Sequence, residues 1–266
     1  SPPWATDSNG TIMEYEFTAL TLSLLIVAGV FAGFINTLAG GGSLLTLPAL
    51  MLLGMPADVA NGTNRVAVLI QSLEATRGFN RYGMLSRQSV LAILAPSLVG
   101  ALVGALVASY LPPSILEPVM LVTLVSMGAI MVLSPSTISP PPGTTPKSPG
   151  NSLPGMLGLF AAGLYGGFIQ AGVGFVLLVV LCGALRYDLV RANALKMVGT
   201  VIFSIMALAV FISRGQVLWV PGLVLAAANV VGVHLSVRFA VSASQRVLRW
   251  FLLVMVILVC LAAWLR

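Results

Sequence analysis

Long apolar runs, broken by short polar stretches, make up most of this 266-residue chain. Runs such as FLLVMVILVCLAAWL do not alternate between apolar and polar positions, so they do not fit the strands of a β-barrel. A run of about 20 apolar residues crosses a bilayer as a helix, because the backbone polar groups have no water to bond in lipid. The pattern therefore predicts an all-α integral membrane protein with about 8–10 transmembrane helices.

The apolar runs fall into two groups around a linker rich in Pro, Ser and Thr at 134–152. A polar segment, 1–16, precedes the first group. We therefore predict a first transmembrane unit at 17–133 and a second at 153–266. The predicted segments are 17–38, 43–54, 59–76, 89–110 and 114–133 in the first unit and 153–172, 175–185, 192–212, 216–237 and 246–265 in the second.

The two units resemble each other in sequence. AGVFAGFINTLAG (28–40) aligns without gaps with AGLYGGFIQAGVG (162–174), and the alignment pairs Asn36 with Gln170. Most Lys and Arg residues stand at segment ends, and placing these ends on the inner face predicts that both termini lie outside. Each unit then crosses the membrane an odd number of times. The second unit is therefore predicted to be inverted relative to the first, as in many secondary transporters.

Glycine interrupts the apolar pattern at matching places in the two units. Gly40–Gly42 precede the short run 43–54, and Gly172-Val173-Gly174 precede the short run 175–185. Paired short segments after glycine breaks point to the midplane binding site of a transporter. A helix beginning near Ser43 would offer free N–H groups and partial positive charge, which favours an anion. The alternative is that these glycines only let helices pack closely.

Polar residues cluster in the segments that follow the two breaks. Asn61, Asn64 and Arg65 lie in the first unit, and Asn193 and Lys196 lie in the second. Cations at this depth are costly and are usually paired or functional, and amides can donate hydrogen bonds to the oxygens of an anion. The alternative is that both cations snorkel to lipid headgroups. The predicted anion site comprises Gly40, Gly41, Gly42, Ser43, Asn61, Asn64, Arg65, Gly172, Gly174, Asn193 and Lys196.

Composition agrees with a membrane protein, since 58% of the residues are hydrophobic, 8% are charged and the mean hydropathy is +1.04. The formal charge of +6 comes from scattered Lys and Arg rather than from a basic patch, so no nucleic-acid partner is expected. Cys182 and Cys260 each lie inside an apolar run, which favours small buried side chains over a disulfide.

Glu74 and His234 are the candidate proton carriers. Glu74 stands three residues before Arg77, a spacing that favours an ion pair at a helix end and leaves a proton relay as the alternative. His234 is the single histidine and is either structural or a proton carrier. Uptake of an anion against an inside-negative potential needs a compensating cation, and the proton is the simplest one. Sodium bound by carbonyls at the helix breaks stays open as a further alternative.

The run GFINTLAGGGSLLTLPALMLLGMPADVANGTNRVAVL resembles the signature of the sulfite exporter TauE/SafE family, the toluene sulfonate uptake permeases, and GLYGGFIQAGVGFVLLVVL…YDLVRANALK is similar to its second copy. The resemblance implies a multi-pass carrier in a bacterial-type cytoplasmic membrane, without a cofactor, for sulfur-containing anions. Sulfite, thiosulfate and organosulfonates such as sulfoacetate are the implied substrates; the direction of transport and the oligomeric state stay open. One departure is that Phe175 and Val176 stand where the first copy continues Gly41-Gly42.

Two other classes compete with a carrier. An intramembrane zinc protease needs a pair of histidines and a b-type haem protein commonly needs two, but the chain holds only His234. A serine protease built on Ser43 and His234 lacks any surrounding acyl-transfer motif. An anion channel could also line a pore with Arg65 and glycine backbone. Counterflow separates a carrier from a channel, because only a carrier exchanges labelled for unlabelled substrate against a gradient.

Overall fold

The computed structural model describes residues 19–38, 40–119, 122–123, 145–147 and 152–242, and within these ranges the regular structure is helical, with no strand. The prediction of an all-α protein is confirmed. The polar segment 1–16, most of the linker 134–152, and the predicted segment 246–265 lie outside the described residues, as does most of 114–133.

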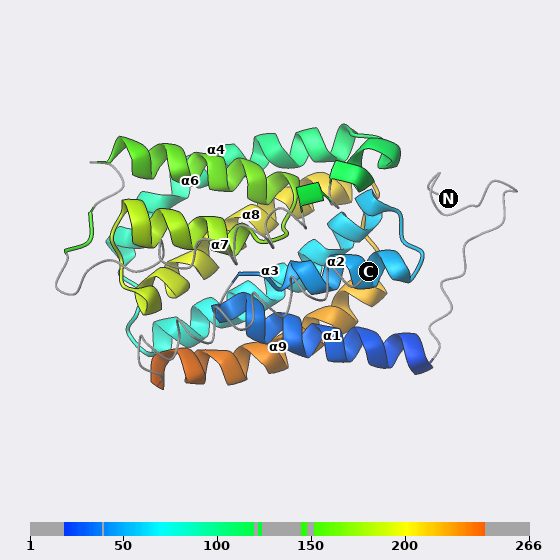
Figure 1. Cartoon of the computed structure of the whole chain (residues 1–266), viewed down its shortest axis with the longest axis horizontal. Helices are drawn as coiled ribbons and strands as arrows, with labels where there is room; N and C mark the ends of the chain where they lie inside the picture. The colour runs from blue at the N-terminus through cyan, green and yellow to red at the C-terminus, as the bar shows by residue number, and fades with distance from the viewer. Residues whose placement is uncertain (1–18, 39, 120–121, 124–144, 148–151, 243–266) are drawn as a thin grey trace, which may run out of the picture.

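The described helices follow the predicted apolar segments closely (Figure 1). In the first unit they include α1 Ala19–Leu38, α2 Ser43–Leu52, α3 Ala57–Arg81 and α4 Arg87–Tyr110. In the second unit they are α6 Leu153–Phe168, α7 Val173–Leu178 with its π-helical continuation η3 Val179–Ala184, α8 Leu189–Ser213 and α9 Trp219–Ser242.

The second break lies earlier than the sequence predicts. The predicted segment 153–172 ends as a helix at Phe168, and Gly172 then adopts a left-handed conformation with φ of +70°. Because α7 already begins at Val173, Gly174 lies in the first turn of that helix rather than in the break, which corrects the predicted boundary. The tight turn at Gly172 lets the chain reverse without a Cβ clash.

The first helix of each unit enters from an opposite end of the molecule and ends near its middle (Figure 1). In this view α1, in dark blue, comes from the right and α6, in green, comes from the left. The short helices α2 and α7 follow these ends after the two breaks. Both breaks are therefore placed inside the protein rather than at its ends.

Glycines bring helices from different units into backbone contact. A Cβ added to Gly33 of α1 would overlap the carbonyl of Asn229 in α9, and one added to Gly167 of α6 would overlap the carbonyl of Ala101 in α4. Small residues allow such close helix approach in membrane proteins. For these glycines, close packing is the role that the structure shows, and α1 pairs with α9 as α4 pairs with α6.

The paired elements also match in length. The central helices α3 and α8 have 25 residues each, and the described parts of α4 and α9 have 24 residues each. In both units a short helix precedes the 25-residue helix. These lengths fit a duplicated unit; the inverted orientation of the repeats in a membrane stays a prediction.

Many large apolar side chains lie on the outer surface, whereas two cationic side chains are buried inside. Leu24, Phe31 and Val99 are among the exposed large hydrophobic residues, whereas Arg65 and Lys196 are among the largest fully buried side chains. The helices Arg87–Tyr110, Leu189–Ser213 and Trp219–Ser242 are each long and apolar enough to span a membrane. This distribution is typical of a protein whose surface meets lipid.

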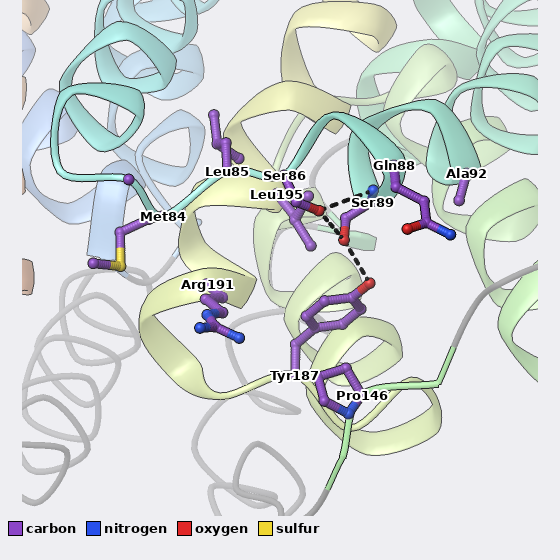
Figure 2. Close-up of a pocket in the computed structure, with 11 residues that line it drawn as sticks. Met84, Leu85, Ser86, Gln88, Ser89, Ala92, Pro146, Tyr187, Arg191 and Leu195 are labelled. Carbon is purple, nitrogen blue, oxygen red and sulfur yellow. Dashed lines mark hydrogen bonds between the residues drawn. The ribbon is translucent and has the colours of Figure 1, made fainter.

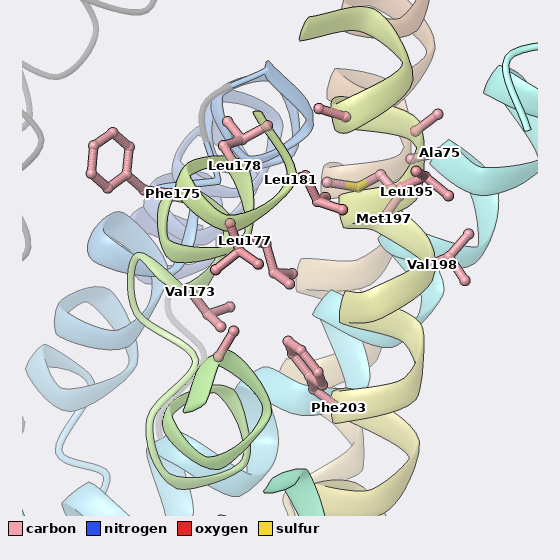
Figure 3. Packing of buried hydrophobic residues seen from close by; sticks show 14 of the residues in the cluster. Ala75, Val173, Phe175, Leu177, Leu178, Leu181, Leu195, Met197, Val198 and Phe203 are labelled. Carbon is pink, nitrogen blue, oxygen red and sulfur yellow. The ribbon is translucent and has the colours of Figure 1, made fainter. Parts of the chain in front are cut away.

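A continuous apolar core packs the short second-unit helix against α8. Figure 3 shows Leu177 of α7 and Leu181 of η3 lying near Met197 and Phe203 of α8. Cys182 in η3 is a free, buried thiol, as its apolar context predicts, while Cys260 lies outside the described residues. The core holds the break that precedes α7 against the central helices.

Candidate functional site

The two helix breaks touch each other inside the protein. Gly40 has φ of +80°, and a Cβ added to it would overlap the Cα of Gly174; the reverse is also true. Only glycine at both positions permits this approach together with a left-handed backbone at Gly40. The structure thus brings together the predicted glycine positions of the two units.

Arg65 on α3 lies beside the C-terminal end of α6. Its side chain is completely buried, with 0% exposed. The guanidinium donates hydrogen bonds to the carbonyls of Gly166, Gly167 (3.0 Å) and Phe168 (3.4 Å) and to the Oε1 of Gln170. The last carbonyls of a helix have no partner within it and carry partial negative charge, so a cation stabilises them.

Lys196 on α8 plays the matching part for α1. Its side chain is also 0% exposed. The Nζ donates to the carbonyls of Asn36 (2.9 Å) and Thr37 (2.8 Å) and to the Oδ1 of Asn193 (2.8 Å). These three bonds use all three donors of the ammonium group.

Each unit therefore supplies the cation that binds the end of the other unit's first helix. Both cations point into the protein, so the snorkelling alternative is wrong for both. Among the residues that the structure describes, no Asp or Glu forms an ion pair with Arg65 or Lys196. Helix dipoles and amide oxygens are thus the described partners of two buried positive charges.

Asn64 and Ser43 hold the start of α2 against α3. The Nδ2 of Asn64 donates to the Oγ of Ser43 (3.2 Å), and its Oδ1 accepts from the hydroxyl of Thr46 (2.7 Å). Asn61, one turn earlier, donates to the carbonyl of Phe168 (2.9 Å), and its Oδ1 accepts from Arg65 (3.2 Å). In both Asn61 and Asn64, the side-chain oxygen and the side-chain nitrogen therefore have hydrogen-bond partners within the protein.

The remaining predicted glycines line the first break. Gly42 directly precedes α2, and its N–H donates to the Oδ1 of Asn36 (3.4 Å). Gly41 lies beside it, and its carbonyl accepts from the N–H of Leu44 (3.0 Å). The amide of Asn36 thus fixes the turn from inside.

Three buried donors near the breaks have no hydrogen-bond partner. They are the Nε of Arg65, the Nε2 of Gln170 and the Nδ2 of Asn193. The predicted site does not include Gln170, although the internal alignment pairs it with Asn36. That pairing was the available sequence signal, because a polar residue recurs there in an otherwise apolar stretch.

Glu74 and His234 lie together on a more exposed part of the molecule. Arg77 donates to Glu74 (3.3 Å), which confirms the predicted ion pair, and the Nε2 of His234 is 3.5 Å from the other carboxylate oxygen. The Nδ1 of His234 lies 2.8 Å from the carbonyl of Val230. In the described part of the chain, no group of three His, Cys, Asp or Glu side chains gathers as metal ligands.

A pocket of about 370 Å³ opens between the start of α4 and the start of α8 (Figure 2). Its lining is largely polar, and the hydroxyl of Tyr187 donates to Ser89 (3.0 Å) across it. Leu195, which precedes Lys196 in the chain, also lines it. The pocket therefore extends from the α3–α4 loop toward the helix that carries the buried lysine.

The α8–α9 loop, which follows α8 as the α3–α4 loop follows α3, is filled. Gln216 in this loop is 7% exposed and donates to the carboxylate of Asp58 (3.0 Å) and to the carbonyl of Ser109 (3.4 Å). The N–H of Leu218 donates to Thr63 (2.9 Å). Side chains thus pack this loop against α3 and α4, in contrast with the open pocket at the other loop.

The sequence model of the sulfite exporter TauE/SafE family matches residues 25–263. The chain belongs to this family. It is similar to a probable membrane transporter protein of Haemophilus influenzae, with 27% identity over 236 residues that cover 88% of this chain and 91% of the relative.

Two further relatives of this TauE/SafE protein have similar coverage. The probable membrane transporter protein YfcA of Escherichia coli K12 is 29% identical over 240 residues, which cover 88% of this chain and 86% of the relative. The probable membrane transporter protein ORF9 of Sinorhizobium sp is 26% identical over 235 residues, 88% of each chain. The names of the relatives agree with a membrane transport protein rather than an enzyme.

Proposed function

We propose that this protein is a secondary transporter that carries a small sulfur-containing anion through a site where the two helix breaks meet. The observation that carries the proposal is the pair of completely buried cations, without an acidic partner among the described ion pairs, beside touching breaks. A buried cation is costly unless opposite charge compensates it. A bound anion would supply that charge.

We propose sulfite, thiosulfate or an organosulfonate such as sulfoacetate as the anion, and membership of a family described as sulfite exporters supports this choice. In the proposed site, the turn Gly40–Ser43 and the glycines Gly172 and Gly174 allow close approach of the backbone. Arg65 and Lys196 provide positive potential while they hold the two helix ends, and the amides around them provide donors. Attraction by a buried charge acts over several ångströms in a low dielectric, so direct contact is not required.

We also propose that the two units are inverted repeats that give access to the site from alternate sides. The pocket beside Arg191 lies at the end where the positive-inside pattern places the cytoplasm, and the Gln216 contacts fill the other end. Cysteines placed at Tyr82 and Leu52, in a background without Cys182 and Cys260, test this orientation. Labelling of position 82 from outside would reverse it.

A binding screen tests the substrate. A ligand that binds only the folded protein raises its stability by mass action, by about 2.7 kcal/mol at a concentration of 100 Kd. Sulfite, thiosulfate, sulfoacetate, isethionate and taurine would be added to the detergent-solubilised protein, with chloride as the control for ionic strength. We expect a rise in the unfolding midpoint with at least one sulfur oxyanion. A folded protein that responds to none of them contradicts the proposal.

Counterflow in proteoliposomes distinguishes a carrier from an anion channel. We expect unlabelled internal substrate to drive uptake of labelled substrate, which a simple pore does not do. If the protein imports, we propose coupling to protons through Glu74 or His234. Flux that ignores an imposed pH gradient at fixed membrane potential, without sodium, would remove proton coupling.

A further inference from the structure

We infer that the side-chain NH₂ groups of Gln170 and Asn193 donate hydrogen bonds to the anionic oxygens of the substrate. The inference rests on the proposed function and names two contacts, one from each unit. Asn193 belongs to the predicted site, but its direction toward a ligand does not follow from the sequence. Gln170 is a new member of the site.

Both amides have their oxygen occupied by a buried cation. Arg65 donates to the Oε1 of Gln170, and Lys196 donates to the Oδ1 of Asn193 at 2.8 Å. A cation cannot accept a hydrogen bond, so it fixes which atom of each amide is oxygen and which is nitrogen. The NH₂ group must then lie on the side of the amide that does not face the bond.

These NH₂ groups are buried without a partner. Gln170 is 2% exposed and Asn193 is 1% exposed, and neither nitrogen has a hydrogen-bond acceptor within reach. Buried polar groups in folded proteins are nearly always bonded, and an exception calls for a specific reason. An acceptor on a bound substrate supplies one.

Other amides near the breaks show what a purely structural role looks like. Asn61 donates to the carbonyl of Phe168, and Asn64 donates to the hydroxyl of Ser43, so both NH₂ groups are used within the protein. An acceptor at the end of α6 is thus available to Asn61, whereas the nearby Gln170 keeps its NH₂ group unbonded. This difference separates the amides that build the breaks from those that keep a donor available.

The two incomplete amides flank the contact between the breaks. Gln170 lies in the second break, between the end of α6 and Gly172. The Lys196 chain that binds Asn193 packs its Cδ toward Gly174, and Gly174 abuts Gly40. One donor thus comes from the break itself and the other from the helix beside it.

The available groups define the chemistry of the ligand. The described side-chain atoms that lack a partner beside the breaks are all donors: two NH₂ groups and the Nε of Arg65, with two buried positive charges beside them. Such a site favours oxygens that are negatively charged and accept without donating, as in sulfite or a sulfonate. An ammonium group on the ligand would meet two buried cations that already occupy carbonyls at the breaks, so sulfoacetate should bind better than taurine.

Two isosteric substitutions test the inference. Asn193→Asp and Gln170→Glu keep the oxygen that accepts from Lys196 or Arg65 and replace the donor with a negative acceptor. We expect each folded variant to bind sulfite, thiosulfate or sulfoacetate, whichever stabilises the wild type, at least about tenfold more weakly. Asn193→Ser and Gln170→Met remove the donor without adding charge and should weaken binding in the same direction.

Asn229→Asp is the matched control, since Asn229 is a buried amide that bonds Gln71 on α3 away from the breaks. It should bind within about twofold of wild type. Affinity equal to wild type in folded Asn193 and Gln170 variants would overturn the inference and leave the proposed transport function standing. Absence of binding of all three anions to the wild type would instead overturn the proposed function, and the inference with it.

Discussion

Arg65 spreads its hydrogen bonds over three carbonyls and two amide side chains, whereas Lys196 directs three bonds to two carbonyls and one amide. The planar guanidinium has five donors in a fixed fork, and the ammonium has three on a flexible stem. The lysine ammonium group therefore has all three donors bonded, while the arginine keeps its Nε unbonded. Both cations thus bind the end of a helix from the other unit, but only the arginine keeps an unbonded donor.

The two helix breaks also differ in the residues that form them. The first is built from three successive glycines and is fixed by the side chains of Asn36 and Asn64. The second contains Gln170 and relies on a single left-handed glycine, Gly172. The arginine and Gln170 thus leave two unbonded donors beside the second break, while the Nδ2 of Asn193 is the unbonded donor beside Lys196.

Removal of the cations should have the largest effect. Arg65→Gln leaves buried carbonyls without their charged donor, so we expect the free energy of unfolding to fall by about 3 kcal/mol or more. Lys196→Gln affects fewer acceptors and should lower it by about 2 kcal/mol. Unfolding midpoints in detergent would rank the two variants. An equal loss of stability in both variants would contradict the inferred difference between the two cations.

The contact between the breaks should be nearly as sensitive. Gly40→Ala combines a left-handed backbone with overlap on Gly174, so we expect a loss of about 2–4 kcal/mol. Gly54 has φ of +86° but open space around it, so Gly54→Ala isolates the backbone strain at about 1–2 kcal/mol. The same unfolding assay compares them. If Gly40→Ala lowers the free energy of unfolding no more than Gly54→Ala does, the close contact between the two breaks is contradicted.

Exchange of the cation type should have an intermediate effect. Arg65→Lys keeps the charge but cannot reach all the acceptors, so we expect a loss of about 1.5 kcal/mol in stability. Thermal unfolding of Arg65→Lys, compared with that of Arg65→Gln, separates the contribution of hydrogen-bond geometry from that of charge. Wild-type stability in Arg65→Lys would mean that the charge alone is sufficient.

The exposed ion pair should matter least. Arg77 is 70% exposed, so Glu74→Gln should change the free energy of unfolding by about 0.5 kcal/mol or less. The same variant measured for flux under a pH gradient tests its proposed part in coupling. A large loss of stability would place Glu74 with the buried structural charges instead.

Much of the fold was predictable because hydrophobicity alone marks segments that lipid will accept. The helices from Ser43 and Arg87 begin within two residues of their predicted starts. The end of α6 was missed because Ile169–Ala171 are as apolar as a helix interior, apart from Gln170. Their departure from helical geometry depends on contacts with α3 that no local pattern records.

The residues of the site were easier to predict than the hydrogen bonds that connect them. Depth within an apolar segment was enough to single out Arg65 and Lys196. Their partners come from the opposite unit, more than a hundred residues away in sequence, and were not visible in spacing. Which amides keep a donor depends on which acceptors the packing has already used, so the unbonded NH₂ group of Gln170 could be recognised only in three dimensions.

The glycine contacts between helices have a mechanical consequence. Gly33 and Gly232 place the backbones of α1 and α9 against each other, and Gly104 and Gly167 do the same for α4 and α6. Sliding within either pair by less than a full helical turn would drive a side chain into a carbonyl. Each pair therefore holds one helix from each unit in a fixed register, so in the proposed transport cycle each pair would move as one rigid body relative to the central helices α3 and α8.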